Sequence, residues 1–226
     1  MKKSGQGGFD LESDKKRALA LTPVSRETQE RLEVFAELLL LWQNKVNLVA
    51  ESTLPLLWTR HISDSLQLLA LAPKARVWVD FGSGAGFPGI PIACALAGTP
   101  GAMVHLVESV GKKANFLREV VSKLGLPAHV HQERAEKFAK TCAETVHVVT
   151  ARALAPLKTL CDQAFPLIAR GALGLFPKGQ DVDAELTEAA KYWRLQASLV
   201  PSVTNPASAI VVVRGLKRLR KYPISH

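Results

Sequence analysis

The chain has 226 residues, 47% of them hydrophobic, and a formal net charge of +9. This length fits one α/β domain with an extension, and no apolar run reaches the ~18 residues that span a bilayer. The N-terminus lacks the apolar core of a signal peptide, and the three cysteines and scattered histidines have no disulfide or metal-ligand spacing, so we expect a cytoplasmic protein that binds no metal.

Residues 1–75 predict a helical extension that precedes the main domain. Residues 1–20 are polar and contain several glycines, and we expect them to be frayed. A helix start is signalled at Ser25, after which apolar residues recur with helical spacing. A second helix is expected over residues 53–71.

A polar cluster interrupts this second helix at His61, Ser63, Asp64 and Ser65. His61 and Asp64 are three residues apart, so they can share one helical face. One interpretation is an acid–base pair. The interpretation we prefer is a structural pair that docks the N-terminal helices onto the following sheet.

A glycine-dense turn follows the apolar run Val77–Val79. The run ends in Asp80, and Gly82, Gly84 and Gly86 come next, before an apolar segment with helical spacing. Strand, glycine turn and helix are the means by which a doubly wound α/β domain binds a nucleotide-like cofactor.

Two patterns fit this turn. Residues 84–89 match G-x-G-x-x-G, the dinucleotide fingerprint, whereas residues 80–86 match acid-x-G-x-G-x-G, which resembles motif I of S-adenosylmethionine-dependent methyltransferases. A pyrophosphate over a helix N-terminus would be opposed by the Asp80 carboxylate, which instead suits an ammonium and a sulfonium. We therefore rank a methyltransferase first, an NAD-dependent oxidoreductase second and a plain turn third.

From residue 76 onward the pattern alternates between strands and helices. It predicts a domain over residues 76–226 with a doubly wound, seven-stranded sheet of the class I, Rossmann-like type, whose last two strands form an antiparallel pair. The expected strands are 76–81, 103–108, 127–131, 146–150, 172–177, 195–200 and 209–214, and the expected helices are 88–97, 111–124, 134–140, 156–169 and 181–192. Glu108 ends the second strand, where an acid commonly holds ribose hydroxyls.

The positive charge is concentrated toward the end of the chain. Residues 151–226 carry 11 basic and 5 acidic side chains, and the last 13 residues hold five basic residues and no acid. A polyanion such as RNA is the functional interpretation of this basic tail, with a merely solubilising tail as the alternative. The candidate RNA contacts there are Lys217, Arg218, Arg220 and Lys221.

Several segments together resemble one family, the bacterial 16S ribosomal RNA guanine-N7 methyltransferases, also called the glucose-inhibited division protein B family. The resemblance covers nearly the whole chain after residue ~25 by pattern and order. The matching segments are FAELLLLWQNKVNLVAEST (35–53), RHISDSL (60–66), DFGSGAGFPGIPIA (80–93), LVESVGKKANFLREV (106–120), ERAEKF (133–138), ARALAPL (151–157) and FPKGQ (176–180).

The resemblance implies S-adenosylmethionine as the cofactor and 16S rRNA, free or in the small subunit, as the partner. Nothing in the sequence indicates an obligate dimer, so we expect a monomer. It implies cofactor contacts at Gly82 and Phe87, at Ala135 and Glu136 beside the adenine, and at Arg152 near the active site. Asp80, Gly84, Gly86 and Glu108 complete the expected cofactor site, and Lys178 is a candidate contact to the RNA backbone.

The implied chemistry needs positioning more than acid–base catalysis. Guanine N7 has a free lone pair and no proton, so an in-line displacement on a sulfonium methyl requires no general base. Arg152 is expected to orient cofactor or phosphate. Open alternatives are a methyltransferase for another RNA or a small molecule, and a non-catalytic RNA-binding protein with a decayed cofactor pocket.

Overall fold

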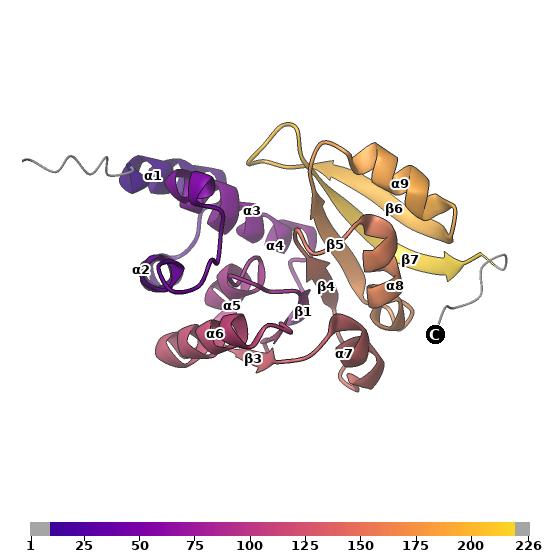
Figure 1. Ribbon diagram of the computed structural model, residues 1–226, viewed down its shortest axis with the longest axis horizontal. Helices are drawn as coiled ribbons and strands as arrows, with labels where there is room; N and C mark the ends of the chain where they lie inside the picture. Colours follow the sequence, from indigo (N-terminus) through magenta and orange to yellow (C-terminus); the bar gives the residue numbers. More distant parts are fainter. Residues whose placement is uncertain (1–9, 220–226) are drawn as a thin grey trace, which may run out of the picture.

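A computed structural model describes residues 10–219 of the chain. The N-terminal helices pack along one side of a seven-stranded sheet (Figure 1). They are α1 (Leu11–Leu21), α2 (Arg26–Gln43), the 3-10 helix η1 (Glu51–Leu56), the π-helix η2 (Leu57–Ser63), α3 (Asp64–Leu66) and α4 (Leu68–Leu71). None of the helices in the described range is long and apolar enough to cross a membrane.

Helix α1 corrects the expectation that residues up to 20 are frayed. Asp10 caps it by accepting a hydrogen bond from the Ser13 backbone N–H at 3.0 Å. Asp14 is buried and accepts from the backbone N–H groups of Trp58 and Thr59 at 2.8 and 3.2 Å. The carboxylate thus satisfies donors at the start of η2, and these long-range bonds hold α1 in place.

The expected helix over 53–71 is helical but not one regular helix. Pro55 lies in η1, and because proline has no N–H this segment cannot complete a regular hydrogen-bond ladder. The wider η2 follows and carries His61. The predicted start at Ser25 is confirmed, since its side chain accepts from the Thr28 N–H and α2 begins at the next residue.

The sheet has the order β3-β2-β1-β4-β5-β7-β6, which confirms the predicted doubly wound architecture. Neighbouring strands among the first five are parallel, whereas β7 is antiparallel to both β5 and β6. The strands are β1 (Val77–Phe81), β2 (Met103–Val107), β3 (Ala128–His131), β4 (Val148–Ala151), β5 (Leu173–Lys178), β6 (Trp193–Pro201) and β7 (Ala209–Arg218).

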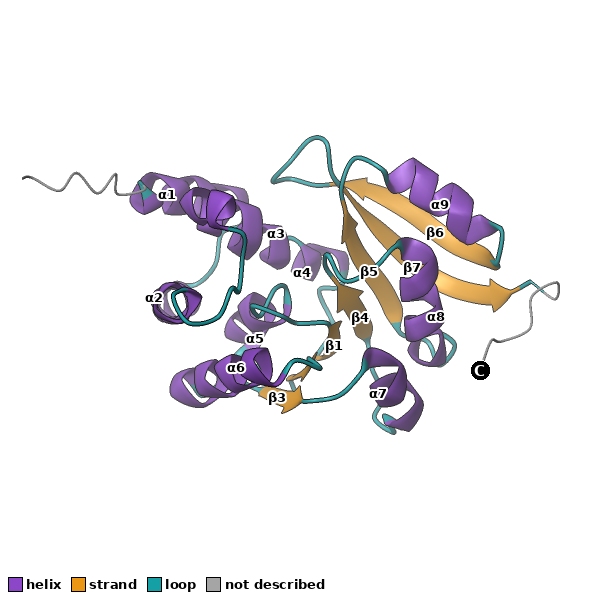
Figure 2. Ribbon diagram, in the orientation of Figure 1, coloured by secondary structure: helices purple, strands orange, loops and turns teal. Residues whose placement is uncertain are grey.

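Two layers of helices cover the sheet (Figure 2). Trp78 of β1 packs in one core with Ile90 and Phe116, whereas the next residue, Val79, packs in the other core with Leu160. All five residues of β1 are buried, as expected of a central parallel strand. The covering helices are α5 (Gly89–Leu96) and α6 (Gly111–Leu124) on the Trp78 side, and α7 (Ala135–Thr141), α8 (Leu157–Ile168) and α9 (Val182–Ala190) on the other.

The final hairpin is longer than predicted, and this corrects the placement of the basic tail. Lys217 and Arg218 lie in β7, where they pair with the start of β6. Ala209 pairs with Lys178 at the carboxyl end of β5, so β7 runs from that edge of the sheet to the opposite one. At about 3.3 Å per residue, Lys217 and Arg218 lie roughly 30 Å away along the strand. Arg220 and Lys221 lie outside the described residues.

Candidate active site at the carboxyl edge of the sheet

The glycine loop after β1 adopts backbone conformations that favour glycine. Gly82, Gly84 and Gly86 have φ values of 62°, 54° and 93°. A Cβ on Gly82 would also lie 2.6 Å from Cδ1 of Leu154, so this side chain would have to shift, and the positive φ adds strain for any other residue. A Cβ on Gly84 would meet only the Gly82 carbonyl oxygen at 3.6 Å. The backbone at Gly84 is therefore open to close approach by a ligand.

Asp80 lies beneath this loop and is fully buried. Its Oδ2 accepts a hydrogen bond from the Gly89 N–H at the start of α5, at 3.1 Å, while Oδ1 has no partner within residues 10–219. Burial raises the pKa of this carboxyl to about 7, although the nearby Ser83 hydroxyl and the Gly89 N–H oppose the shift. The side chain expected to face a cationic cofactor is thus enclosed, and it fixes the turn into α5.

Glu108 connects the glycine loop to the segment after β2. Its two carboxylate oxygens accept from the N–H groups of Gly84 and Val110 at 2.9 and 2.7 Å. Glu108 therefore lies at the expected strand end, but both oxygens already bind backbone donors. A role toward ribose hydroxyls stays a prediction.

The predicted adenine contacts lie at the start of α7. Ala135 is nearly buried, and Glu136 accepts a hydrogen bond from the Gln163 side chain at 2.6 Å. This bond joins α7 to α8. The two residues therefore follow β3 as expected, at the same edge of the sheet as the glycine loop.

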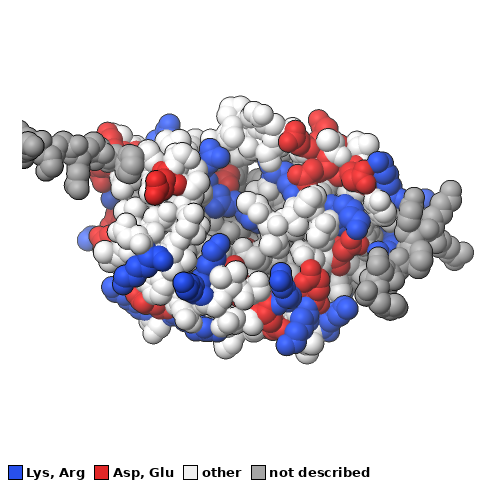
Figure 3. All heavy atoms as spheres, viewed as in Figure 1, with Lys and Arg blue, Asp and Glu red and all other residues white. Residues whose placement is uncertain are grey.

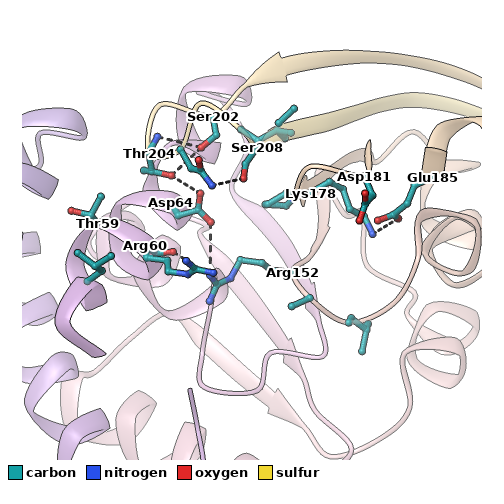
Figure 4. A pocket seen from close by; sticks show the side chains of 18 of the residues that line it. Thr59, Arg60, Asp64, Arg152, Lys178, Asp181, Glu185, Ser202, Thr204 and Ser208 are labelled. Atoms are coloured by element: carbon teal, nitrogen blue, oxygen red, sulfur yellow. Dashed lines mark hydrogen bonds and ion pairs between the residues drawn. The ribbon is translucent and has the colours of Figure 1, made fainter. Parts of the chain in front are cut away.

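Arg152 connects the sheet to the N-terminal helices at the end of β4. Its guanidinium lies 2.8 Å from Nδ1 of His61, donates to the Arg60 carbonyl at 3.3 Å and lies 3.8 Å from Oδ2 of Asp64. The Asp64–Arg152 contact is drawn in Figure 4. Burial lowers the pKa of Arg152 and raises that of Asp64, so each group is held charged against a desolvation cost.

His61 and Asp64 do not bond each other; both bind Arg152 instead. Burial, reinforced by the positive charges of Arg152 and Arg60, lowers the pKa of His61 to about 3. His61 is therefore neutral at physiological pH, and it accepts from Arg152 at Nδ1 while Nε2 faces Thr53 Oγ1 at 2.9 Å. This geometry supports docking of the helices onto the sheet rather than an acid–base pair.

Phe87, a predicted cofactor contact, has an enclosed side chain. Its ring stacks on His61 with 5.0 Å between centroids, meets Phe35 of α2 edge-on at 5.3 Å, and lies 5.1 Å from the Arg152 guanidinium carbon. The ring thus ties the glycine loop to α2 and η2. A ligand in this loop would meet its backbone before its ring.

A cavity of about 920 Å³ opens beside the glycine loop, between η2, the β4–α8 and β5–α9 loops and the β6–β7 loop (Figure 4). Asp64 is fixed in its wall because Oδ1 accepts from Thr204 Oγ1 at 2.8 Å and from Gln67 Nε2 at 2.7 Å. The residues that form the charged part of the lining are Arg17, Arg60, Asp64, Arg152, Lys178, Asp181 and Glu185.

Lys178 lines this cavity but is not an exposed cation. Its Nζ lies 2.7 Å from Oε2 of Glu185 and donates to the Ala155 carbonyl at 2.8 Å, and only 9% of its side chain is exposed. The same Glu185 oxygen accepts from the Leu157 N–H at the start of α8. Lys178 therefore holds the β5 end to the β4–α8 loop, which makes a contact with RNA backbone less direct than predicted.

Leu154 separates the cavity from the glycine loop. It contacts Gly82 on one side and lines the cavity on the other. The preceding Ala153 is the one non-glycine residue with positive φ, 53°, in the described chain. A cofactor on the glycine loop and an acceptor in the cavity would thus meet at the Arg152–Leu154 segment.

Sequence reasoning missed Arg17, Arg60 and Leu154. Arg60 lay next to the polar cluster already singled out, and Leu154 lay inside the ARALAPL segment, so local signals for both existed. Arg17 carried no signal, because the polar composition of its segment predicts a solvent-exposed chain end. Lys217 and Arg218 do not line the cavity; Arg218 instead contacts Asp162 at 3.4 Å and lies over the Trp193 ring.

Residues 28–211 match the family model described as "GidB: rRNA small subunit methyltransferase G". A protein named ribosomal RNA small subunit methyltransferase G from Bradyrhizobium sp. (strain ORS 278) is 57% identical over 209 residues, covering 92% of this chain and 94% of the relative. The protein of the same name from Nitrobacter hamburgensis is 53% identical over 211 residues, covering 93% of this chain and 81% of the relative.

Among solved structures, the fold is similar to a putative O-methyltransferase from Klebsiella pneumoniae, with a TM-score of 0.55, 11% identity, and coverage of 90% of this chain and 96% of that one. It is also similar to a point mutant of MtNAS in complex with S-adenosylmethionine, with a TM-score of 0.51, 16% identity, and coverage of 92% and 86%. These similarities concern the fold alone.

Proposed function

The chain belongs to the GidB family, the rRNA small subunit methyltransferases G, and from that premise we propose that it transfers a methyl group from S-adenosylmethionine to N7 of a guanosine in 16S rRNA. The observation that carries the proposal is the family match, which spans both the glycine loop and the Arg152 segment beside the cavity. We further propose that it acts as a cytoplasmic monomer on rRNA, free or in the small subunit.

The glycine loop fits S-adenosylmethionine better than a dinucleotide. Its backbone is open at Gly84. Two carboxyl groups lie next to it, Glu108 bonded to the loop and Asp80 beneath it with one oxygen unpartnered among the described residues. Acidic groups here favour an ammonium and a sulfonium and oppose a pyrophosphate. Gly82, Gly84, Gly86 and Glu108 are the residues that would hold the cofactor.

The chain's residues would act by positioning. S-adenosylmethionine supplies an activated methyl group when bound, and N7 attacks without losing a proton. No base is then needed, in agreement with a His61 that is neutral and bonded at both nitrogens and an Asp64 held by Thr204 and Gln67. Arg152 is rigidly held at the boundary between loop and cavity, so it would orient the acceptor nucleotide. Holding reactants in line can contribute roughly 7–11 kcal/mol in the best cases.

The test is methyl transfer from radiolabelled S-adenosylmethionine to 16S rRNA and to small subunits that lack the modification. We expect label in RNA and strand scission at one guanosine after reduction and aniline treatment, which reveals N7-methylguanosine. The matched control is Gly84→Val, which places a side chain in the open part of the loop and should abolish cofactor binding. Label in no RNA, or at an atom other than N7, would overturn the proposal.

A further inference from the structure

The N-terminal helices bring two additional arginines to the cavity. Arg17 of α1 and Arg60 of η2 line it together with Arg152, and Leu21 and Leu56 lie on the same side. Helix α1 lies outside residues 28–211, which the family model matches. This wall, formed by Arg17, Leu21, Leu56 and Arg60 and called here the α1–η2 wall, has no role in the cofactor site described above.

Arg17 is held in place yet still exposed. Its Nε donates to Thr59 Oγ1 at 3.1 Å and one terminal nitrogen donates to Asp14 Oδ1 at 3.0 Å, while 56% of the side chain is exposed. Asp14 is buried and its oxygens also accept from the backbone of Trp58 and Thr59. Because a guanidinium has five N–H donors, Arg17 retains donors for a ligand at fixed orientation.

Arg60 is the less compensated charge. It is exposed, and its guanidinium has no hydrogen bond or ion pair with another described residue. It lies close enough to His61 and Arg152 to lower the pKa of both. A cation that repels its neighbours in the free protein favours an anion in the cavity beside them.

Charge is divided across the cavity. Lys178 on the opposite side is neutralised by Glu185, and Asp181 adds a further negative charge there. Figure 3 shows acidic side chains gathered over α9, whereas basic and acidic side chains are mixed over the rest of this face. On the side of the N-terminal helices Arg17 is paired with Asp14 and Arg152 with Asp64, so the excess positive charge there comes from Arg60. An anionic ligand is therefore favoured at the α1–η2 wall and disfavoured at α9.

Apolar side chains stand beside these arginines. Leu21, Leu56 and Leu154 are among the exposed large hydrophobic residues, at 41%, 40% and 39% exposure, and all three line the cavity. Single-stranded RNA presents phosphates and flat base faces in alternation, and proteins meet it with cations next to apolar or aromatic surfaces. The wall matches this pattern, whereas a free phosphate would leave the leucines without a partner.

We propose that the α1–η2 wall binds the RNA strand that flanks the methylated nucleotide: Arg17 and Arg60 bind its phosphates, and Leu21 and Leu56 pack against an unstacked base. This deepens the proposed function, on which it rests for the identity of the RNA. It also locates the RNA backbone at the cavity, at the edge of the sheet opposite to Lys217 and Arg218.

The test measures binding of a fluorescein-labelled 12-nucleotide single-stranded RNA by anisotropy over a series of salt concentrations. Each phosphate contact contributes about 0.7 to the slope of log K against log salt for single strands, so we expect Arg17→Gln and Arg60→Gln each to reduce the slope by about 0.7 and the double variant by about 1.4. With 16S rRNA as substrate, KM should rise while kcat at saturating RNA is kept.

Three further variants make the result interpretable. Arg170→Gln is the matched control, because Arg170 is exposed and bonded to backbone carbonyls of Pro166 and Cys142 outside the cavity, and its slope should equal wild type. Arg17→Lys keeps the charge and should keep the slope. An unchanged slope in the double variant, or a reduction seen with Lys217→Gln instead, would overturn the proposal. If the wild-type protein does not methylate rRNA, the proposed function is refuted, whereas the salt dependence of RNA binding still tests the α1–η2 wall.

Discussion

Replacing Arg152 by methionine and Asp64 by asparagine, singly and together, should separate stability from activity at this ion pair. Both side chains are largely buried, with 19% and 15% exposed, and burial shifts the pKa of each toward its neutral form. Burial thus opposes both charges more strongly than their mutual attraction favours them. A pair of this kind contributes little net stability, although removing one partner is costly.

The geometry sets the magnitude. At 3.8 Å and an effective dielectric of about 20, the attraction is about 4 kcal/mol, an upper value for partly exposed groups. Arg152→Met also removes the bonds to His61 and the Arg60 carbonyl and leaves Asp64 buried, so we expect a loss of roughly 2–4 kcal/mol. Asp64→Asn removes the carboxylate that faces Arg152, whose charge then keeps only the hydrogen bonds to His61 and the Arg60 carbonyl. The double variant should be more stable than the sum of the two losses predicts, by about 2 kcal/mol.

The assay is urea unfolding followed by circular dichroism at pH 7.5, together with single-turnover methyl transfer. We expect stability to recover in the double variant while methyl transfer stays as low as in Arg152→Met. Losses that add within about 0.5 kcal/mol would show that the two groups are not coupled. Recovery of methyl transfer in the double variant would refute the proposed positioning role of Arg152.

Three other changes test single groups. The pKa of His61 is about 3 in the folded protein and 6.5 in the unfolded chain. Its stability contribution is therefore present above pH 6.5 and is lost toward pH 3, by up to roughly 1.4 kcal/mol per pH unit. His61→Gln should make the thermal stability less dependent on pH over this window, and an unchanged pH profile would contradict the lowered pKa. For Asp80 the pH dependence has the opposite sign, because its folded pKa of about 7 exceeds the unfolded value of 3.8. Its stability contribution is present below pH 3.8 and is lost as the pH rises to 7. Asp80→Asn should therefore raise Tm more at pH 8 than at pH 5. Gly82→Ala places a side chain at a φ of 62° and close to Leu154, so chemical denaturation should show a loss of about 1–3 kcal/mol in unfolding free energy. Isothermal titration should show weaker S-adenosylmethionine binding. A wild-type unfolding free energy together with wild-type affinity would count against the tight loop contact.

Much of the fold follows from local patterns. Signals that act over a few residues predict the parallel sheet and the edge at which the candidate site lies. These signals are the apolar run before Asp80, the glycine positions and the alternation of strands and helices. Helix α1 could not be predicted this way, since Asp14 is satisfied by backbone groups 44 and 45 residues further along the chain. A charged residue in a charged segment is normally exposed.

The candidate site residues show the same limit. The sequence places Asp80, Glu108 and Arg152 at strand ends, as observed, but not what each carboxylate or guanidinium contacts. Asp80 binds the start of α5 and Glu108 binds the glycine loop. The basic neighbours of Lys217 and Arg218 predict a tail. In the structure both residues belong to a strand whose partners lie more than 20 residues earlier, in β6. Pairings of that range leave no local signal.

The position of β7 between β5 and β6 determines when the cavity can form during synthesis. β6 has no place in the sheet until β7 has paired with β5, and β7 is the last strand of the described chain. Ala209 and Ile210 of β7 also line the cavity. A growing chain that has assembled β1 to β5 therefore has its glycine loop but no closed acceptor cavity. Under the proposed function, the capacity to bind cofactor should therefore appear earlier in translation than the capacity to hold RNA.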